Sequence, residues 1–175
     1  MNLTPRLFAK LLTNSYVASL PTGADVAHLE HTADGGATVA NPQNLTQDPD
    51  FLAVNPEWKD QLINSPALAD IFVPLGHSDS AWAVWSYVMA DQNARDFLDG
   101  KPDPWGMVVN PWASTSAELN GSVNPPGTAN EYPADNFPRT DPTEADLGGV
   151  AGSIANVITW RPYSNDFEQD GYWVL

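Results

Sequence analysis

The stretch GHSDSAWAVWSYV, residues 76–88, carries the clearest helix signal in the chain. A serine and an acidic residue precede a long apolar run, which is the pattern of a capped helix N-terminus. We predict a helix from Asp79 or Ser80 to about Ala90. Four of its side chains are expected to be buried: Trp82, Trp85, Val88 and Met89.

The polar start of this stretch has a catalytic, a structural and a ligand-binding interpretation. His77, Ser78, Asp79 and Ser80 supply the residue types of a hydrolytic triad. A nucleophile elbow needs G-x-S-x-G, however, and GHSDS lacks the second glycine. Neighbours along a chain also cannot point at one another as triad members do. The pattern favours Ser78 as a helix cap, and exposed hydroxyl and N–H groups there can hold an anion without catalysis.

The composition limits the classes of partner. With 22 acidic against 7 basic residues, the formal net charge is −15, which repels nucleic acid and anionic lipid surfaces. The absence of cysteine excludes disulfides, thiolate metal sites and a cysteine nucleophile. No stretch approaches the roughly 20 apolar residues of a membrane span, so this segment is not expected to insert into a membrane. The N-terminus follows a helical period and does not look like a signal peptide.

Helix N-termini are marked repeatedly by a capping residue followed by proline, whose missing N–H is harmless at the first helical position. This pair occurs at Thr4-Pro5, Asp48-Pro49, Asn55-Pro56, Ser65-Pro66 and Asp141-Pro142. Around the first pair, Leu3 and Phe8 are placed to form a hydrophobic staple. After the last, Glu144 completes an acidic capping box. We therefore expect a series of short, capped helices.

Further helices and strands are assigned from local signals. Asp91 is expected to cap a helix over QNARDFLDG, which buries Phe97 and Leu98 and ends at Gly100. Short helices are expected after Asn55, burying Trp58, Leu62 and Ile63, and over residues 67–72. Candidate strands are GATVA (36–40), MVV (107–109) and the terminal GYWVL (171–175).

The length suits a single domain over residues 1–175. Within it, residues 1–100 are read as the helical part, and 101–140 as a long loop region rich in Pro and Gly. Residues 141–175 are read as a helix, over DPTEADLGGVAGSIANVITW, followed by the terminal strand. Three glycines weaken that helix: Gly148, Gly149 and Gly152. The expected fold class is thus mainly α with minor β.

Metal and cofactor sites are not predicted. HLEH (28–31) spaces two imidazoles by one helical turn but lacks the H-E-x-x-H frame and further ligands. TQDPDF (46–51) and DGKPDPWG (99–106) hold paired Asp residues without the frame of a calcium loop, and their prolines suit caps and turns. Four tryptophans in or near loops are candidates for a binding surface: Trp105, Trp112, Trp160 and Trp173.

Three runs carry a family resemblance: LTPRLFAKLLTNSY (3–16), NPQNLTQDPDFLAVNPEW (41–58) and PLGHSDSAWAVWSYVMADQNARDFLDGKPDPWGMVVNP (74–111). They resemble part of a group of large actinobacterial cell-surface proteins with a periplasmic-binding-protein-like domain of type II, related to phosphate-binding receptors of importers. The resemblance implies that the chain is a segment of a longer protein, lacking most of the parallel sheet. Such receptors bind solutes with hydroxyls, an Asp and helix N-termini. Ser78, Asp79 and Ser80 offer that chemistry, with His77 as the basic group.

These observations lead to one expectation and two alternatives. We expect a non-catalytic, extracellular or cell-surface solute-binding-like module, part of a larger surface protein, with a small solute such as an anion as its ligand. One alternative is a fragment of a secreted hydrolase acting on glycans, which needs two carboxyls about 5–10 Å apart across a Trp-lined cleft. The other is an adhesion or scaffold module without a small ligand.

Overall fold

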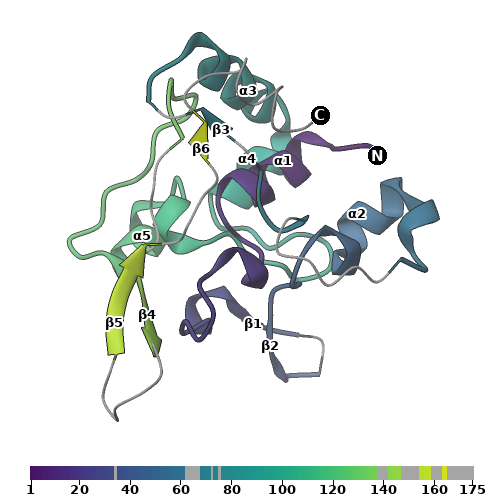
Figure 1. Cartoon of the computed structure of the whole chain (residues 1–175), viewed down its shortest axis with the longest axis horizontal. Coiled ribbons are helices and arrows are strands. Elements are labelled where there is room, and N and C mark those ends of the chain that lie inside the picture. The colour runs from purple at the N-terminus through teal and green to yellow at the C-terminus, as the bar shows by residue number, and fades with distance from the viewer. Residues whose placement is uncertain are drawn as a thin grey trace.

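The helix α1 (Pro5–Leu12) lies at the centre of the computed structural model, with α4 (Gln92–Leu98) beside it and α3 (Asp79–Ala90) above (Figure 1). The hairpin of β4 and β5 projects at the lower left, and α2 (Pro49–Val54) lies at the right. The structure describes residues 1–33, 35–61, 68–71, 73–74, 76–137, 142–146, 154–158 and 163–164. The chain is mainly helical with minor β-structure, which confirms the predicted class.

Local capping chemistry sets where α1 begins. The Thr4 hydroxyl accepts a hydrogen bond from the Leu7 N–H at 3.3 Å, and Pro5 takes the first helical position. Leu7, Leu11 and Leu12 form the buried stripe of the helix. Leu3 and Phe8 lie partly buried against the core. The predicted cap at Thr4 and the proline at the first helical position are confirmed.

The helix α3 agrees with its prediction in its bounds and differs in one buried residue. Ser78 caps it, and Ala81, Trp85 and Val88 are buried. Met89 is partly buried, but Trp82 is 51% exposed, contrary to expectation. The buried residues Ala81, Trp85 and Val88 are spaced i, i+4 and i+7, so they share one face of the helix. Trp82 directly follows Ala81 and therefore lies outside this buried face.

The helix α4 follows the sequence prediction closely. The Asp91 side chain accepts from the Ala94 N–H, and Phe97 and Leu98 are buried. Gly100 follows the helix with φ of +100°, and a Cβ there would lie 2.1 Å from a methyl carbon of Leu119. The positive φ angle favours glycine at this helix end, and the Leu119 side chain occupies the space that a Cβ would take.

Several short elements accompany these helices in the described residues: the 3₁₀ helices Val17–Ser19, Ala27–Leu29, Leu45–Gln47, Pro56–Trp58 and Pro111–Ala113, and α5 (Ala117–Val123). The element after Asn55 is only a 3₁₀ turn, with Trp58 half-buried, because the Asn55 side chain does not cap it. Asn55 instead donates to the carbonyl oxygens of Asn2 and Phe51. The pair at 65–66, Leu62 and Ile63 lie outside the described residues. Of the helix expected over 67–72, the structure describes residues 68–71, and these are not α-helical.

Residues 101–140 are not loop throughout. The helix α5 forms there because Ser116 caps it, accepting from the Leu119 N–H. The predicted strand at 107–109 is wrong, although Met107 and Val109 are buried. Asn41 supplies the explanation, since its side chain donates to the Val108 carbonyl and accepts from the Val108 N–H. The Asn41 side chain thus makes the two backbone hydrogen bonds that a neighbouring strand would otherwise make with Val108.

The strands form three two-stranded sheets in the described residues. β1 (Glu30–Thr32) pairs antiparallel with β2 (Thr38–Ala40), in the register Glu30 to Ala40, which confirms the strand predicted within 36–40. β3 (Val73–Pro74) and β6 (Tyr163–Ser164) pair in parallel. β4 (Pro142–Asp146) and β5 (Ile154–Ile158) pair antiparallel.

The helix expected over 141–160 is wrong, because β4 and β5 occupy part of this range. Pro142 is the first residue of β4 and pairs with Ile158, so Asp141-Pro142 does not start a helix. Glycine disfavours a helix interior, and the run after the glycines contains Ile154, Val157 and Ile158, whose branched side chains favour strands. The terminal strand predicted at 171–175 lies outside the described residues.

A charged cluster lies inside the core, and no sequence pattern predicted it. The side chain of Lys10 on α1 is fully buried. Its Nζ atom lies 2.8 Å from Asp48, 3.0 Å from Asp50 and 2.6 Å from Asp103. The hydroxyl of Tyr16 donates to Asp48 at 2.7 Å. The two Asp-Pro segments that suggested calcium loops therefore meet around a lysine ammonium.

The same carboxylates also organise the backbone around them. Asp48 caps α2 by accepting from the Asp50 N–H. Asp103 accepts from the N–H groups of Trp105 and Met107, both at 2.9 Å, which holds a tight turn. Each Asp thus uses one oxygen for local structure and the other for the distant Lys10.

Burial and charge act in opposition on the pKa values of this cluster. Burial alone acts to lower the pKa of Lys10, but the charges of the three carboxylates outweigh it and raise that pKa above its ordinary value. Burial raises the pKa of Asp48 although Lys10 acts to lower it. Burial also acts to raise the pKa of Asp50. The bidentate pair of Asp50 with Arg6 and the charge of Lys10 outweigh burial and hold this pKa below its ordinary value.

Replacing Lys10→Met is expected to destabilise the protein by about 3–5 kcal/mol, because three carboxylates lose their buried counter-charge. Urea unfolding followed by Trp fluorescence measures this. Lys101→Met is the matched control, since Lys101 is exposed and pairs with Asp96 at the surface, where such pairs contribute about 1 kcal/mol at most. Equal effects of the two substitutions would contradict the role given to Lys10.

The stability contributed by Asp50 should depend on pH with a definite sign. Because its pKa is lowered on folding, the contribution is present above the unfolded pKa of about 3.9 and is lost as pH falls through the folded pKa. The difference in unfolding free energy between wild type and Asp50→Asn should therefore shrink below about pH 4. A difference in unfolding free energy for Asp50→Asn that stays constant from pH 7 to pH 2.5 would refute the assignment.

Candidate functional site

The start of α3 gathers the four residues predicted to bind a ligand. The Ser78 hydroxyl accepts from the Ala81 N–H at 3.1 Å, so Ser78 is the helix cap. Ser80 donates to the same oxygen at 3.2 Å. Asp79 is exposed in the first turn, and Ser80 is half-buried. The hydroxyls therefore bond to the helix start and to each other.

His77 pairs with a residue that the sequence did not single out. Its Nδ1 lies 2.7 Å from a carboxylate oxygen of Asp135, and both side chains are exposed, at 73% and 56%. The carbonyl of Asp135 accepts from the Ser78 N–H at 2.7 Å. Among the hydrogen bonds of the described residues, none joins His77 to Ser78 or Ser80. No sequence signal marks Asp135, because its partner is 58 residues away.

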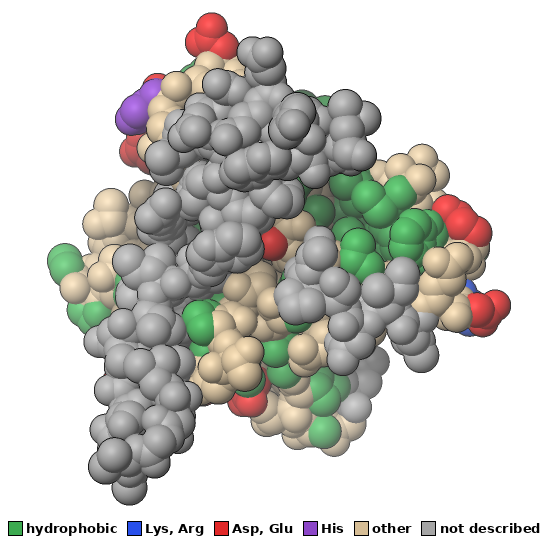
Figure 2. Space-filling model, viewed as in Figure 1, with side chains coloured by type: hydrophobic (Ala, Val, Ile, Leu, Met, Phe, Trp, Pro, Cys, Tyr) green, Lys and Arg blue, Asp and Glu red, His purple; other side chains and the backbone are tan. Residues whose placement is uncertain are grey.

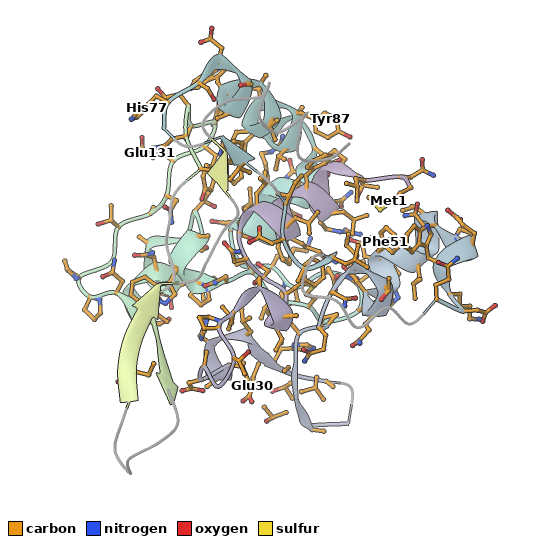
Figure 3. All side chains as sticks on the ribbon, viewed as in Figure 1. Met1, Glu30, Phe51, His77, Tyr87 and Glu131 are labelled. Atoms are coloured by element: carbon orange, nitrogen blue, oxygen red, sulfur yellow. The ribbon has the colours of Figure 1, made fainter. Side chains whose placement is uncertain are left out.

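The segment 130–137 is fixed along α3 by aromatic contacts. The Trp85 indole N–H donates to the Asn136 carbonyl at 3.0 Å. The Tyr132 ring stacks on Trp85, with centroids 3.8 Å apart and planes at 14°. The Tyr132 hydroxyl also donates to the Ala113 carbonyl. This segment connects the tip at His77 with Glu131, and Figure 3 shows both on the same side of the molecule.

An open groove of about 550 Å³ lies where this segment passes α4. Its lining residues come from the end of α3, from α4 and from two loops: Met89, Gln92, Arg95, Asp96, Asp99, Thr115, Asn130, Glu131 and Tyr132. The volume is in the range of small-molecule sites. None of these residues was predicted as a ligand contact, since they are brought together only by the packing of 130–132 on α4.

The histidine pair and the loop tryptophans are placed as follows. His28 lies in the 3₁₀ helix Ala27–Leu29 and His31 in β1, with the His31 ring against Gly106. The described residues contain no group of three or more His, Asp or Glu side chains that could hold a metal ion. Trp105 is 46% exposed and Trp112 is half-buried. Residues 160 and 173 lie outside the described part of the chain.

The comparisons with known proteins leave the class of the chain open. Neither a protein-family model, nor a curated protein, nor a solved structure matches it. In the described part of the chain, no helix has both the length and the apolar character that crossing a bilayer requires.

Ser78→Ala should lower the unfolding free energy by about 0.5–2 kcal/mol, the usual cost of a lost N-cap. Urea titration at neutral pH measures the change. Ser80→Ala should cost less, because the Ser80 hydroxyl bonds only to Ser78 among the described residues. A larger loss for Ser80→Ala than for Ser78→Ala would show that the capping role is assigned wrongly.

Proposed function

We propose that the chain is a non-catalytic, extracellular solute-binding-like module of a larger surface protein. The observation that carries the proposal is the exposed tip at the start of α3, where His77, Asp79 and Ser80 surround a capped helix N-terminus. Hydroxyl, imidazole and helix N–H groups are the chemistry with which proteins hold small polar solutes and anions.

The hydrogen bonds at this tip favour binding over catalysis. A serine nucleophile needs a base within hydrogen-bond reach of its hydroxyl. The Ser78 hydroxyl accepts two hydrogen bonds, and His77 is paired with Asp135. The contact with the Asp135 carboxylate orients the exposed imidazole of His77 at the tip.

The finer assignment, a segment of a type II periplasmic-binding-protein-like domain at the cell surface, rests on the resemblance of the three sequence runs. The capped helices α1, α2 and α3 lie within those runs. A location outside the cell is part of the same proposal.

An adhesion role is a second candidate, favoured by exposed aromatic side chains on α3. Trp82 and Tyr87 are about half exposed on this helix. Tyr87 makes an edge-to-face contact with Phe8 of α1, at 5.9 Å between ring centroids. Such rings provide contact area for a protein partner.

A thermal-shift screen with phosphate, sulfate, calcium and neutral sugars tests the solute-binding proposal. A ligand at 100 times its Kd should stabilise the fold by about 2.7 kcal/mol and so raise Tm. The gain should be lost in His77→Ala, whose side chain is exposed, and kept in the surface control Ser122→Ala.

Two outcomes would contradict this proposal. One is the absence of any shift with all four ligand types. The other is turnover of an ester, peptide or glycoside by the purified chain, which should occur at no detectable rate.

A further inference from the structure

The carboxylate of Asp103 contacts the buried Lys10 with one oxygen and the backbone with the other. Its Oδ2 atom lies 2.6 Å from the Lys10 Nζ atom. Its Oδ1 atom accepts hydrogen bonds from the N–H groups of Trp105 and Met107, both at 2.9 Å. The carboxyl carbon of Asp103, Cγ, therefore lies between an amine nitrogen and a pair of N–H donors.

This pair of N–H donors is held in place by the turn at 103–107. The Asp103 N–H donates to the Met107 carbonyl and the Gly106 N–H to the Asp103 carbonyl, both at 3.0 Å, and Gly106 takes a φ of +95° in the turn. When a nucleophile attacks a carboxyl carbon, negative charge develops on its oxygen, and N–H donors already aimed at that oxygen stabilise the charge. The donors on Oδ1 have this arrangement toward an attack by the Lys10 amine.

Asp48 is placed to carry protons at the same amine. Its Oδ2 atom lies 2.8 Å from the Lys10 Nζ atom and accepts from the Tyr16 hydroxyl at 2.7 Å. Burial raises the pKa of Asp48, which favours its protonated form. Asp50 differs, because both of its oxygens are paired with Arg6. Asp48 is therefore the carboxylate suited to accept a proton from Lys10 and to pass it on.

Water is excluded from the reacting groups. The side chains of Lys10, Asp48 and Asp103 have no exposed surface, and the Phe97 ring centroid lies 5.9 Å from the Lys10 Nζ atom. The acidic side chains that Figure 2 shows on the described part of one face are, by contrast, at the surface. Burial acts against the charged forms of Lys10 and Asp48, so a proton transfer that neutralises both removes this cost. A dry site also protects an amide, once formed, from hydrolysis.

We propose that Lys10 and Asp103 join through an amide bond inside the folded protein, with Asp48 as the proton carrier. The Lys10 ammonium gives up two of its three protons, the Nζ atom bonds to Cγ of Asp103, and the bond from Cγ to Oδ2 breaks. Asp48 accepts each proton in turn and passes it to Oδ2, which leaves as water. Oδ1 stays as the amide oxygen on the two N–H donors. One positive and one negative charge disappear together, so atoms and charge balance.

The ion pair in the structure is the state before this bond forms. Lys10 and Asp103 are 93 residues apart, so the bond would tie α1 to the turn at 103–107. A cross-link over such a distance constrains the unfolded chain as a disulfide does. The chain contains no cysteine, and the amide would supply that constraint by other chemistry.

Mass spectrometry of the purified chain under denaturing conditions tests the proposal. The chain should be lighter than its sequence by the mass of one water molecule. Trypsin should leave the chain uncut after residue 10 and release residues 7–59 joined to residues 96–139, since the bond after residue 101 precedes a proline. The digest also locates the loss of water, because a succinimide at an Asp-Gly pair would give linear fragments.

Two variants and a matched control test the roles of the residues. Lys10→Arg keeps the positive charge without the amine, and Asp48→Asn keeps an acceptor oxygen but cannot carry protons, so both should have the full mass of their sequences. Lys101→Arg is the control, because Lys101 lies 2.8 Å from Asp96 but is 71% exposed. This control should keep both the loss of water and the joined fragments.

The wild-type measurement decides the matter even where a variant does not fold. A wild-type chain of full mass, a loss of water found in a linear fragment, or joined fragments in Asp48→Asn would each overturn the proposal. None of these results depends on whether a ligand binds at the Ser78 tip.

Discussion

The ammonium group of Lys10 lies where water does not reach it, and carboxylates from two other segments surround it. An isolated buried charge is among the most costly features a fold can contain. The cost is offset only when Asp48, Asp50 and Asp103 are all in place, so the three segments cannot separate independently. This constraint fixes α1 against the start of α2 and against the turn at 103–107.

Other parts of the structure depend on the position of that turn. Beyond it, the Asn110 N–H donates to the Ser15 hydroxyl at 2.9 Å, and Asn41 bonds to Val108. These buried polar side chains satisfy the backbone of a loop that has no strand partner. Trp105 is exposed at the turn, and its backbone is held by Asp103, whose other oxygen contacts Lys10. The core thus contains a connected polar network beside its apolar cluster.

The proposed tip and the open groove both use the segment 130–137, which lies against α3. One end of this segment supplies Asp135 to the tip and the other supplies Glu131 to the groove. Trp85 fixes the segment through a hydrogen bond and a ring stack. A buried side chain of α3 therefore positions residues of both surfaces.

The sequence alone determined where several helices begin. Thr4, Asp48, Ser78 and Asp91 all cap as predicted, because capping joins a side chain to a backbone N–H only two or three residues away. Gly100 was predicted for the same local reason. The same local signals failed at Asp141-Pro142, where pairing of two strands overrode the cap pattern.

Tertiary structure alone decided which side chains meet across the chain. Nothing near Lys10 in the sequence reveals Asp103, 93 residues away. The exposure of Trp82, the His77–Asp135 pair and the groove bordered by Asp99 and Glu131 follow equally from packing between distant segments. Hydrogen bonds within one helical turn depend on neighbouring residues, whereas burial and long-range pairing depend on how whole elements are arranged.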